Sequence, residues 1–152
     1  MLITLCSTIK FWPQIIEVKE KLESMGHEVL IPPDKVKNKE GDLISAQEYY
    51  ELRRNMMKDG GEEHNWIWQR KKDAIMWHFE KVSKADVVLV LNFEKNNIAN
   101  YIGGNTFLEM GVAMWLDKPI YLYNPIPKEL SYTEEIRGMH PIVIEGDLSL
   151  IK

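Results

Sequence analysis

Two short segments of the sequence combine residue types that can hold an anion or a sugar hydroxyl. The first is Cys6-Ser-Thr-Ile-Lys10, which offers two hydroxyls, backbone N–H groups at a helix start and one lysine. The alternative is that Ser7 or Thr8 only caps the helix and that Lys10 is a solvated surface charge. The residue types of this segment leave both interpretations open.

The second segment is Gly103-Gly-Asn-Thr-Phe-Leu-Glu109. Gly103 and Gly104 let a ligand approach the backbone closely, and the helix that follows presents its positive end to whatever binds there. The alternative is a capping box running from Thr106 to Glu109, in which the glutamate only returns a hydrogen bond to the backbone. Spacing alone favours the cap over a functional glutamate.

Other chemistry is weakly indicated. Asp86 opens an apolar run, where an acid usually ends the preceding helix or pairs with a lysine. The four histidines show no short ligand spacing and Cys6 is the lone cysteine, so we predict no metal and no cofactor. A phosphate-binding Walker loop, a complete Gly-x-Gly-x-x-Gly fingerprint and a serine elbow are all missing from the sequence. These absences weaken ATPase, dehydrogenase and serine hydrolase interpretations.

The elements that would position these segments alternate along the chain. Apolar runs predict strands over residues 2–6, 29–31, 87–91, 119–123 and 142–144. Apolar spacing and cap signals predict helices over residues 12–25, 45–57, 62–83, 104–117 and after a capping box that starts at Ser131. Residues 34–41 are lysine-rich and predict a mobile surface loop, and residues 58–61 predict a turn.

Strands that alternate with helices predict an α/β fold with one parallel sheet. We expect a flavodoxin-like, doubly wound, five-stranded sheet of order 2-1-3-4-5, with helices on both faces and a single domain over residues 1–152. Ligands bind such sheets beyond the carboxyl ends of the strands, where the order reverses. The two loops at that point are residues 7–11 and 92–105, which overlap both candidate segments.

Composition narrows the class of partner. The chain is 45% hydrophobic and 28% charged with a net charge of -4, so no overall positive field attracts a nucleic acid polymer or an anionic membrane. We expect neither as a partner. The single cysteine, the absence of a long apolar stretch and an amino terminus unlike a signal peptide favour a cytoplasmic location.

The sequence resembles the nucleoside 2-deoxyribosyltransferase family and its sibling, the 2'-deoxynucleoside 5'-monophosphate N-glycosidases. The resemblance follows the element order of nearly the whole chain and concentrates in residues 5–10, 85–90 and 103–113. Glu109-Met-Gly-Val-Ala113 occupies the place of the family's Glu-x-Gly-x-Ala helix start, which carries the nucleophilic glutamate. The resemblance therefore implies that Glu109 is the nucleophile rather than a cap.

The resemblance also implies roles for neighbouring residues. It implies that Asp86 orients the glutamate or handles a proton at the leaving base, and that the loop formed by Ser7, Thr8, Ile9 and Lys10 meets the 5' end of the sugar. Two departures affect substrate binding. Lys10 stands where the monophosphate hydrolases carry an arginine, and Gly103 stands where transferases often carry an acid, for which Asn105 is the candidate substitute.

The function implied is cleavage or transfer of the N-glycosidic bond of a 2'-deoxynucleoside or its 5'-monophosphate, so the partner is a small molecule. The alternative is a non-catalytic nucleotide-binding module of the same fold. Flavin binding is a distant third, and Gly-Gly-x-Thr-x-x-Glu also resembles the cytokinin-activating phosphoribohydrolases, which cleave the same type of bond. The resemblance implies a homo-oligomer, with the aromatic-rich helix around residues 66–77 as a contact surface.

Overall fold

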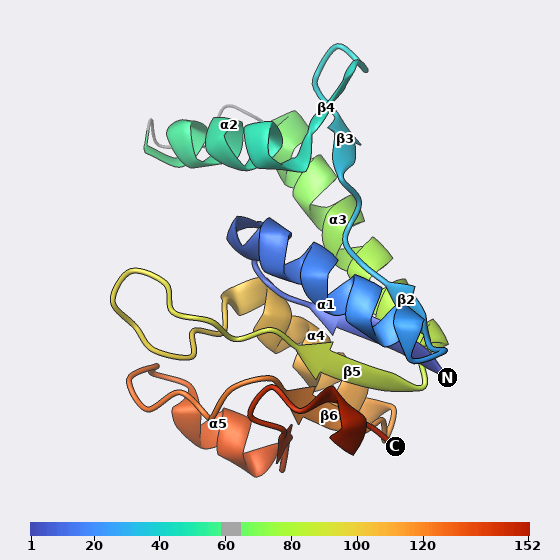
Figure 1. Cartoon of the computed structure of the whole chain (residues 1–152). Coiled ribbons are helices and arrows are strands. Elements are labelled where there is room, and N and C mark those ends of the chain that lie inside the picture. Colours follow the sequence, from blue (N-terminus) through green and yellow to red (C-terminus); the bar gives the residue numbers. More distant parts are fainter. Residues whose placement is uncertain (59–64) are drawn as a thin grey trace.

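The computed structural model describes residues 1–58 and 65–152, and a parallel sheet of five strands lies at its centre (Figure 1). The strands are β1 (Leu2–Cys6), β2 (Glu28–Leu30), β5 (Val87–Val90), β6 (Ile120–Leu122) and β7 (Ile142–Val143). Their order is β2-β1-β5-β6-β7, and every neighbouring pair is parallel. Counted along the chain this is 2-1-3-4-5, so the predicted flavodoxin-like fold class is confirmed.

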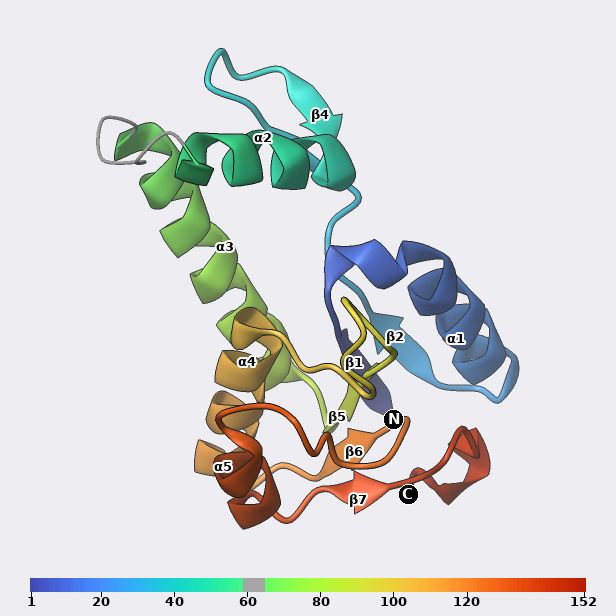
Figure 2. The ribbon, with the colours of Figure 1, turned by 90° about the vertical axis from the view of Figure 1, so that its left-hand side faces the viewer.

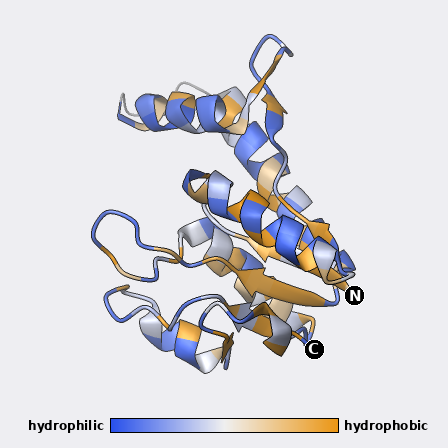
Figure 3. Cartoon of the chain, in the orientation of Figure 1, coloured by the Kyte–Doolittle hydropathy of each residue, from blue (hydrophilic) through white to orange (hydrophobic). Residues whose placement is uncertain are grey.

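The strands are buried on both faces because successive side chains point to opposite sides of the sheet. Ile3, Leu5 and Leu89 face one apolar cluster, whereas Val88 and Val90 face the other. Colouring by hydropathy shows the central strand β5 as apolar along its length (Figure 3). Continuous apolar runs of this kind are typical of a sheet covered by helices on both sides.

Helices cover the two faces unequally (Figure 2). The helix α1 (Trp12–Ser24) buries Ile15, Val18 and Leu22 on the first face, following the 3.6-residue period read in the sequence. The second face is covered by α3 (Asn65–Lys84), α4 (Gly104–Trp115) and α5 (Thr133–Gly138). The chain also forms two short 3-10 helices, η1 (Ile9–Phe11) and η2 (Leu148–Leu150). No helix in the described ranges is both long and apolar enough to cross a membrane.

A second layer stands away from the sheet, beyond the carboxyl end of β1 (Figure 1). It consists of a hairpin, β3 (Lys35–Lys37) with β4 (Leu43–Ser45), followed by α2 (Ala46–Lys58). Residues 34–41 were predicted to be a mobile surface loop, and the structure corrects this for residues 35–37, which pair with β4, whereas residues 38–41 lie outside any strand. The turn predicted at residues 58–61 and the predicted start of the next helix at Glu62 fall on or next to residues 59–64, outside the described residues.

The sequence also matches a capping box from Ser45 to Glu48, and this box and the one predicted from Ser131 have different outcomes. Ser45 Oγ accepts a hydrogen bond of 3.0 Å from the backbone N–H of Glu48, so the cap at the start of α2 is confirmed. The capping box predicted from Ser131 is wrong, because α5 begins at Thr133 with Tyr132 in the cap position and no side-chain cap. The Thr133 hydroxyl donates instead to the carbonyl of Pro127, which ties the helix start to the preceding loop.

Candidate active site

A cavity of about 320 Å³ opens where β1 and β5 end, between the sheet and the layer that contains α2. Most of the residues proposed from the sequence line it, namely Ser7, Thr8, Ile9, Gly103, Gly104, Asn105 and Glu109. The two candidate segments lie roughly 100 positions apart in the sequence, and parallel pairing of β1 with β5 brings their ends together. The fold thus forms a cavity at the predicted point of strand-order reversal.

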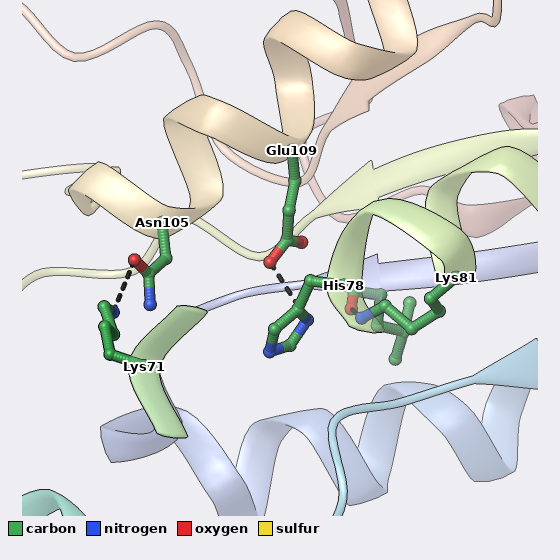
Figure 4. Close-up of polar contacts among 6 residues, drawn as sticks. Lys71, His78, Lys81, Asn105 and Glu109 are labelled. Carbon is green, nitrogen blue, oxygen red and sulfur yellow. Dashed lines mark hydrogen bonds and ion pairs between the residues drawn. The ribbon is translucent and has the colours of Figure 1, made fainter. Parts of the chain in front are cut away.

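Glu109 lies in the second turn of α4 rather than at its start. The helix begins at Gly104 with Gly103 in the cap position, and no side chain caps it. Thr106 is inside the helix and buried, so it cannot be the first residue of a capping box. The capping interpretation of Glu109 is therefore wrong, and its side chain is directed across the cavity wall toward α3 (Figure 4).

His78 on α3 faces this carboxylate. Its Nδ1 lies 3.1 Å from Glu109 Oε1, within hydrogen-bond reach, although Nδ1 has no well-aligned hydrogen bond (Figure 4). Burial, assisted by the charges of Lys81 and Lys71, lowers the pKa of His78 to about 3. The imidazole is therefore neutral near pH 7, so the contact is not an ion pair.

The carboxylate of Glu109 is only 2% exposed although it lines the cavity. Burial raises its pKa, while the charge of Lys81, the neighbouring Cys6 thiol and the charge of Lys71 oppose that rise. Glu109 Oε2 has no hydrogen-bond partner in the described part of the chain. An unpaired buried polar atom costs about 1–3 kcal/mol and calls for an explanation, and a site that awaits a reactant provides one.

Lys81 and Lys71 support the site from α3. Lys81 is 4% exposed, and its Nζ donates a 2.9 Å hydrogen bond to the carbonyl of Leu5 on β1. Lys71 Nζ donates a 2.6 Å hydrogen bond to Asn105 Oδ1 on α4 (Figure 4). These two contacts connect α3 to the sheet and to the start of α4, which fixes the helix that carries His78 against the carboxylate.

Two residues proposed from the sequence are not part of this arrangement. Asp86 Oδ2 accepts a 2.7 Å hydrogen bond from the backbone N–H of Leu2, at the amino ends of β5 and β1. This is the opposite edge of the sheet from Glu109, so the predicted role of Asp86 in orienting the glutamate is wrong. Lys10 lies in η1 and does not line the cavity, so the structure does not support its predicted contact with the substrate.

A second cavity of about 280 Å³ adjoins the first. The two share His78, Tyr49 and Val36 in their walls, and the second adds the ring of Trp77 and the side chain of Asp73. Within residues 1–58 and 65–152 no cluster of three or more potential metal ligands is found. The wall between the cavities is built mainly from side chains of α2, α3 and the hairpin.

The comparisons with known proteins find a likeness among solved structures. No family model and no curated protein matches the chain. Among solved structures the chain is similar to the CMP N-glycosidase BcmB of Clostridium botulinum, with 17% identity, a TM-score of 0.47, and coverage of 95% of this chain and 86% of that one. Similarity at this level carries no functional argument, so the function has to be inferred from the site itself.

Sequence reasoning missed several residues of the site. His78 shares one side of the predicted long helix with Ile67, Ala74 and Val82, and a histidine among apolar neighbours was the available signal for it. Arg53, Lys71 and Lys95 also line the cavity and were not proposed. Their positions depend on how α2 and α3 fold back over the sheet, and no local pattern in the sequence specifies that arrangement.

Proposed function

We propose that this chain cleaves or transfers the N-glycosidic bond of a 2'-deoxynucleoside or its 5'-monophosphate, with Glu109 as the nucleophile. One observation carries the proposal: a carboxylate that is almost fully buried, lines a cavity at the carboxyl edge of the sheet and keeps one oxygen unpaired. Cleavage of a glycosidic bond passes through an oxocarbenium-like state, which a nearby carboxylate stabilises and then traps.

The chemistry proceeds in two displacements. In the first, a carboxylate oxygen of Glu109 bonds to the anomeric carbon as the bond to the base nitrogen breaks, and the base leaves with that electron pair and takes up a proton. In the second, water or another base attacks the anomeric carbon and loses a proton, which releases the carboxylate. Attack by water gives hydrolysis, and attack by a base gives transfer.

In this proposal His78 has the positioning role that the resemblance gave to Asp86. Its neutral imidazole can donate a hydrogen bond from Nδ1 to Oε1 without placing a second positive charge beside the developing oxocarbenium ion. The positive charges of Lys81 and Lys71, which lie on α3 with His78, favour the ionised form of Glu109. The carboxylate can therefore be ionised in a buried position and still remain available to the sugar.

The direct test is turnover of a panel of 2'-deoxynucleosides and their 5'-monophosphates, with and without an acceptor base. We expect release or exchange of base with the wild type and a loss of at least 1,000-fold in kcat with Glu109→Gln, in line with the size of nucleophile effects. Asp86→Asn is the matched control, because it makes the same carboxylate-to-amide change at the opposite edge of the sheet and should retain activity.

Glu109→Gln should also fold at least as stably as the wild type. Burial raises the pKa of Glu109, so between the unfolded and the folded pKa the folded chain holds a proton that the unfolded chain has released. The free energy of unfolding therefore falls as pH rises through the interval between these two pKa values. A Glu109→Gln variant that folds and retains turnover would refute the nucleophile. A wild type that binds nucleotides without turnover would favour the non-catalytic module.

A further inference from the structure

The main cavity has a charge opposite to that of the whole chain. The sequence has 19 lysines and arginines against 23 aspartates and glutamates, which gives a net charge of -4. The cavity wall nevertheless contains three cations, Arg53, Lys71 and Lys95, and a single carboxylate, Glu109. A local excess of positive charge inside a concave wall raises the local concentration of anions.

These cations come from three separate parts of the fold. Arg53 lies on α2, Lys71 lies on α3, and Lys95 lies in the segment between β5 and α4. None of the three forms an ion pair with a carboxylate anywhere in the described parts of the chain. Glu109 interacts with Lys71 through its charge only, so all three cations remain available to a ligand.

Aromatic rings hold two of them in place. The guanidinium of Arg53 lies 5.5 Å from the ring centre of Tyr50 and 5.8 Å from that of Tyr49, and Lys95 Nζ lies 4.7 Å from the ring centre of Tyr101. All three tyrosines line the same cavity. Cation–π contacts orient a charged group without consuming its hydrogen-bond donors, so the donors of Arg53 and Lys95 are preorganised for an anion.

Lys71 links this cationic group to the proposed nucleophile. Its Nζ is bonded to Asn105, and burial followed by the charge of Arg53 lowers its pKa to about 8, while Glu109 acts to raise it. The positive charges of Lys71 and Arg53 therefore oppose each other. An anion placed beside them would relieve that repulsion, whereas a neutral sugar hydroxyl would not.

Building on the function proposed above, we propose that Arg53, Lys71 and Lys95 form a phosphate subsite and that the substrate is a nucleotide with a phosphomonoester rather than a free nucleoside. A phosphomonoester carries about -1.5 to -2 charges near pH 7 and offers three acceptor oxygens. Three cations in the wall of one cavity match that charge. The phosphate is thus held by α2, α3 and the β5–α4 segment instead of by Lys10 in the loop after β1.

The test compares each deoxynucleoside with its 5'-monophosphate as substrates for Arg53→Gln and Lys95→Gln. We expect either substitution to lower kcat/KM for the monophosphate about tenfold or more, as loss of a hydrogen bond to a charged group does, and to change kcat/KM for the nucleoside less than about threefold. Lys72→Gln is the matched control, because it removes one positive charge from the exposed side of α3, next to Lys71, outside the cavity wall. Equal losses on both substrates, or none on either, would overturn the phosphate subsite.

A binding measurement separates this inference from the proposed reaction. Calorimetry on Glu109→Gln should show binding of inorganic phosphate and of a nucleoside monophosphate. In the double variant that also carries Arg53→Gln, both affinities should be about tenfold weaker. Binding with these properties in a protein that turns over no substrate would support the phosphate subsite and refute the glycosidase. Turnover that depends on Glu109 but shows no preference for the monophosphate would refute the subsite and keep the reaction. Circular dichroism of each variant verifies that it is folded.

Discussion

At the scale of single residues, the site depends on how one buried carboxylate is kept usable. Burial favours the protonated form of Glu109, and the charge of Lys81, the Cys6 thiol and the charge of Lys71 favour the ionised form. His78 contacts the same carboxylate but stays neutral above about pH 3, so its titration does not affect activity near neutrality. Ionisation of Glu109 is therefore the step that low pH should suppress.

We accordingly predict an acidic limb in the pH profile of kcat/KM that lies above the ordinary pKa of a glutamate. Activity should fall as pH drops through the raised pKa of Glu109, because only the carboxylate can attack. Lys81→Met removes the cation that most opposes the rise, so its limb should shift to higher pH. A limb that stays in place or moves to lower pH in a folded Lys81→Met protein would contradict this assignment.

The sequence predicts the position of a site residue where that residue directly follows or precedes a predicted strand. The glycine pair and Glu109 follow a strand, so their place at the carboxyl edge of the sheet was predictable. Asp86 precedes the same strand, and the structure accordingly places it at the amino edge, bonded to Leu2. The resemblance pointed to Asp86 as a partner of Glu109, whereas the direction of β5 separates the two.

At the scale of elements, burial on both faces made the sheet predictable. β5 is a continuous apolar run and β1 a nearly continuous one, the pattern typical of strands buried on both faces of a parallel sheet. The hairpin of β3 and β4 was missed because its strands have three residues each and two of the three residues of β3 are lysines. It forms through pairing and through contact with α2, and Val36 at its centre closes both cavities.

The helix α2 provides an element-scale prediction, because its start depends on one side chain. Ser45 Oγ accepts the 3.0 Å hydrogen bond from the Glu48 N–H, and Ser45→Ala should lower the free energy of unfolding by about 1 kcal/mol. Hydrogen exchange should become faster at the amides in the first turn of α2. The protection of the β5 amides should fall only by the change in the global free energy of unfolding. Ser45→Asn, which can also cap, is the matched variant and should retain the wild-type protection; equal loss in both variants would argue against the cap.

At the scale of the whole molecule, the two layers create the site together. The sheet presents the loop after β1 and the start of α4, and α2 with α3 supplies the opposite wall with Arg53, Lys71 and His78. The first layer follows from strand order and was predictable. The second depends on the packing of a hairpin and two helices against that edge, so its cations could not be assigned to the cavity from the sequence.

The outer surface of the second face leads to a prediction about assembly. Met76 on α3 and Leu108 and Trp115 on α4 are exposed large apolar side chains, Trp115 at 86%, and α3 packs beside α4 (Figure 2). Exposed apolar groups on neighbouring helices are typical of an interface between subunits. We therefore expect a homo-oligomer that contacts its second copy through α3 and α4, which extends the contact surface predicted from the sequence to α4.

Sedimentation velocity of the wild type should show a dimer or larger species, and Trp115→Glu should shift the population toward monomer by placing a charge in an apolar contact. Leu43→Glu is the matched control, because Leu43 is an exposed apolar residue of the hairpin and lies on neither α3 nor α4. A wild type that sediments as a monomer, or an equal effect of both substitutions, would refute this surface. Since Glu109 is on α4 and His78 is on α3, a monomeric Trp115→Glu protein with reduced kcat would further indicate that assembly fixes the two helices that carry the site.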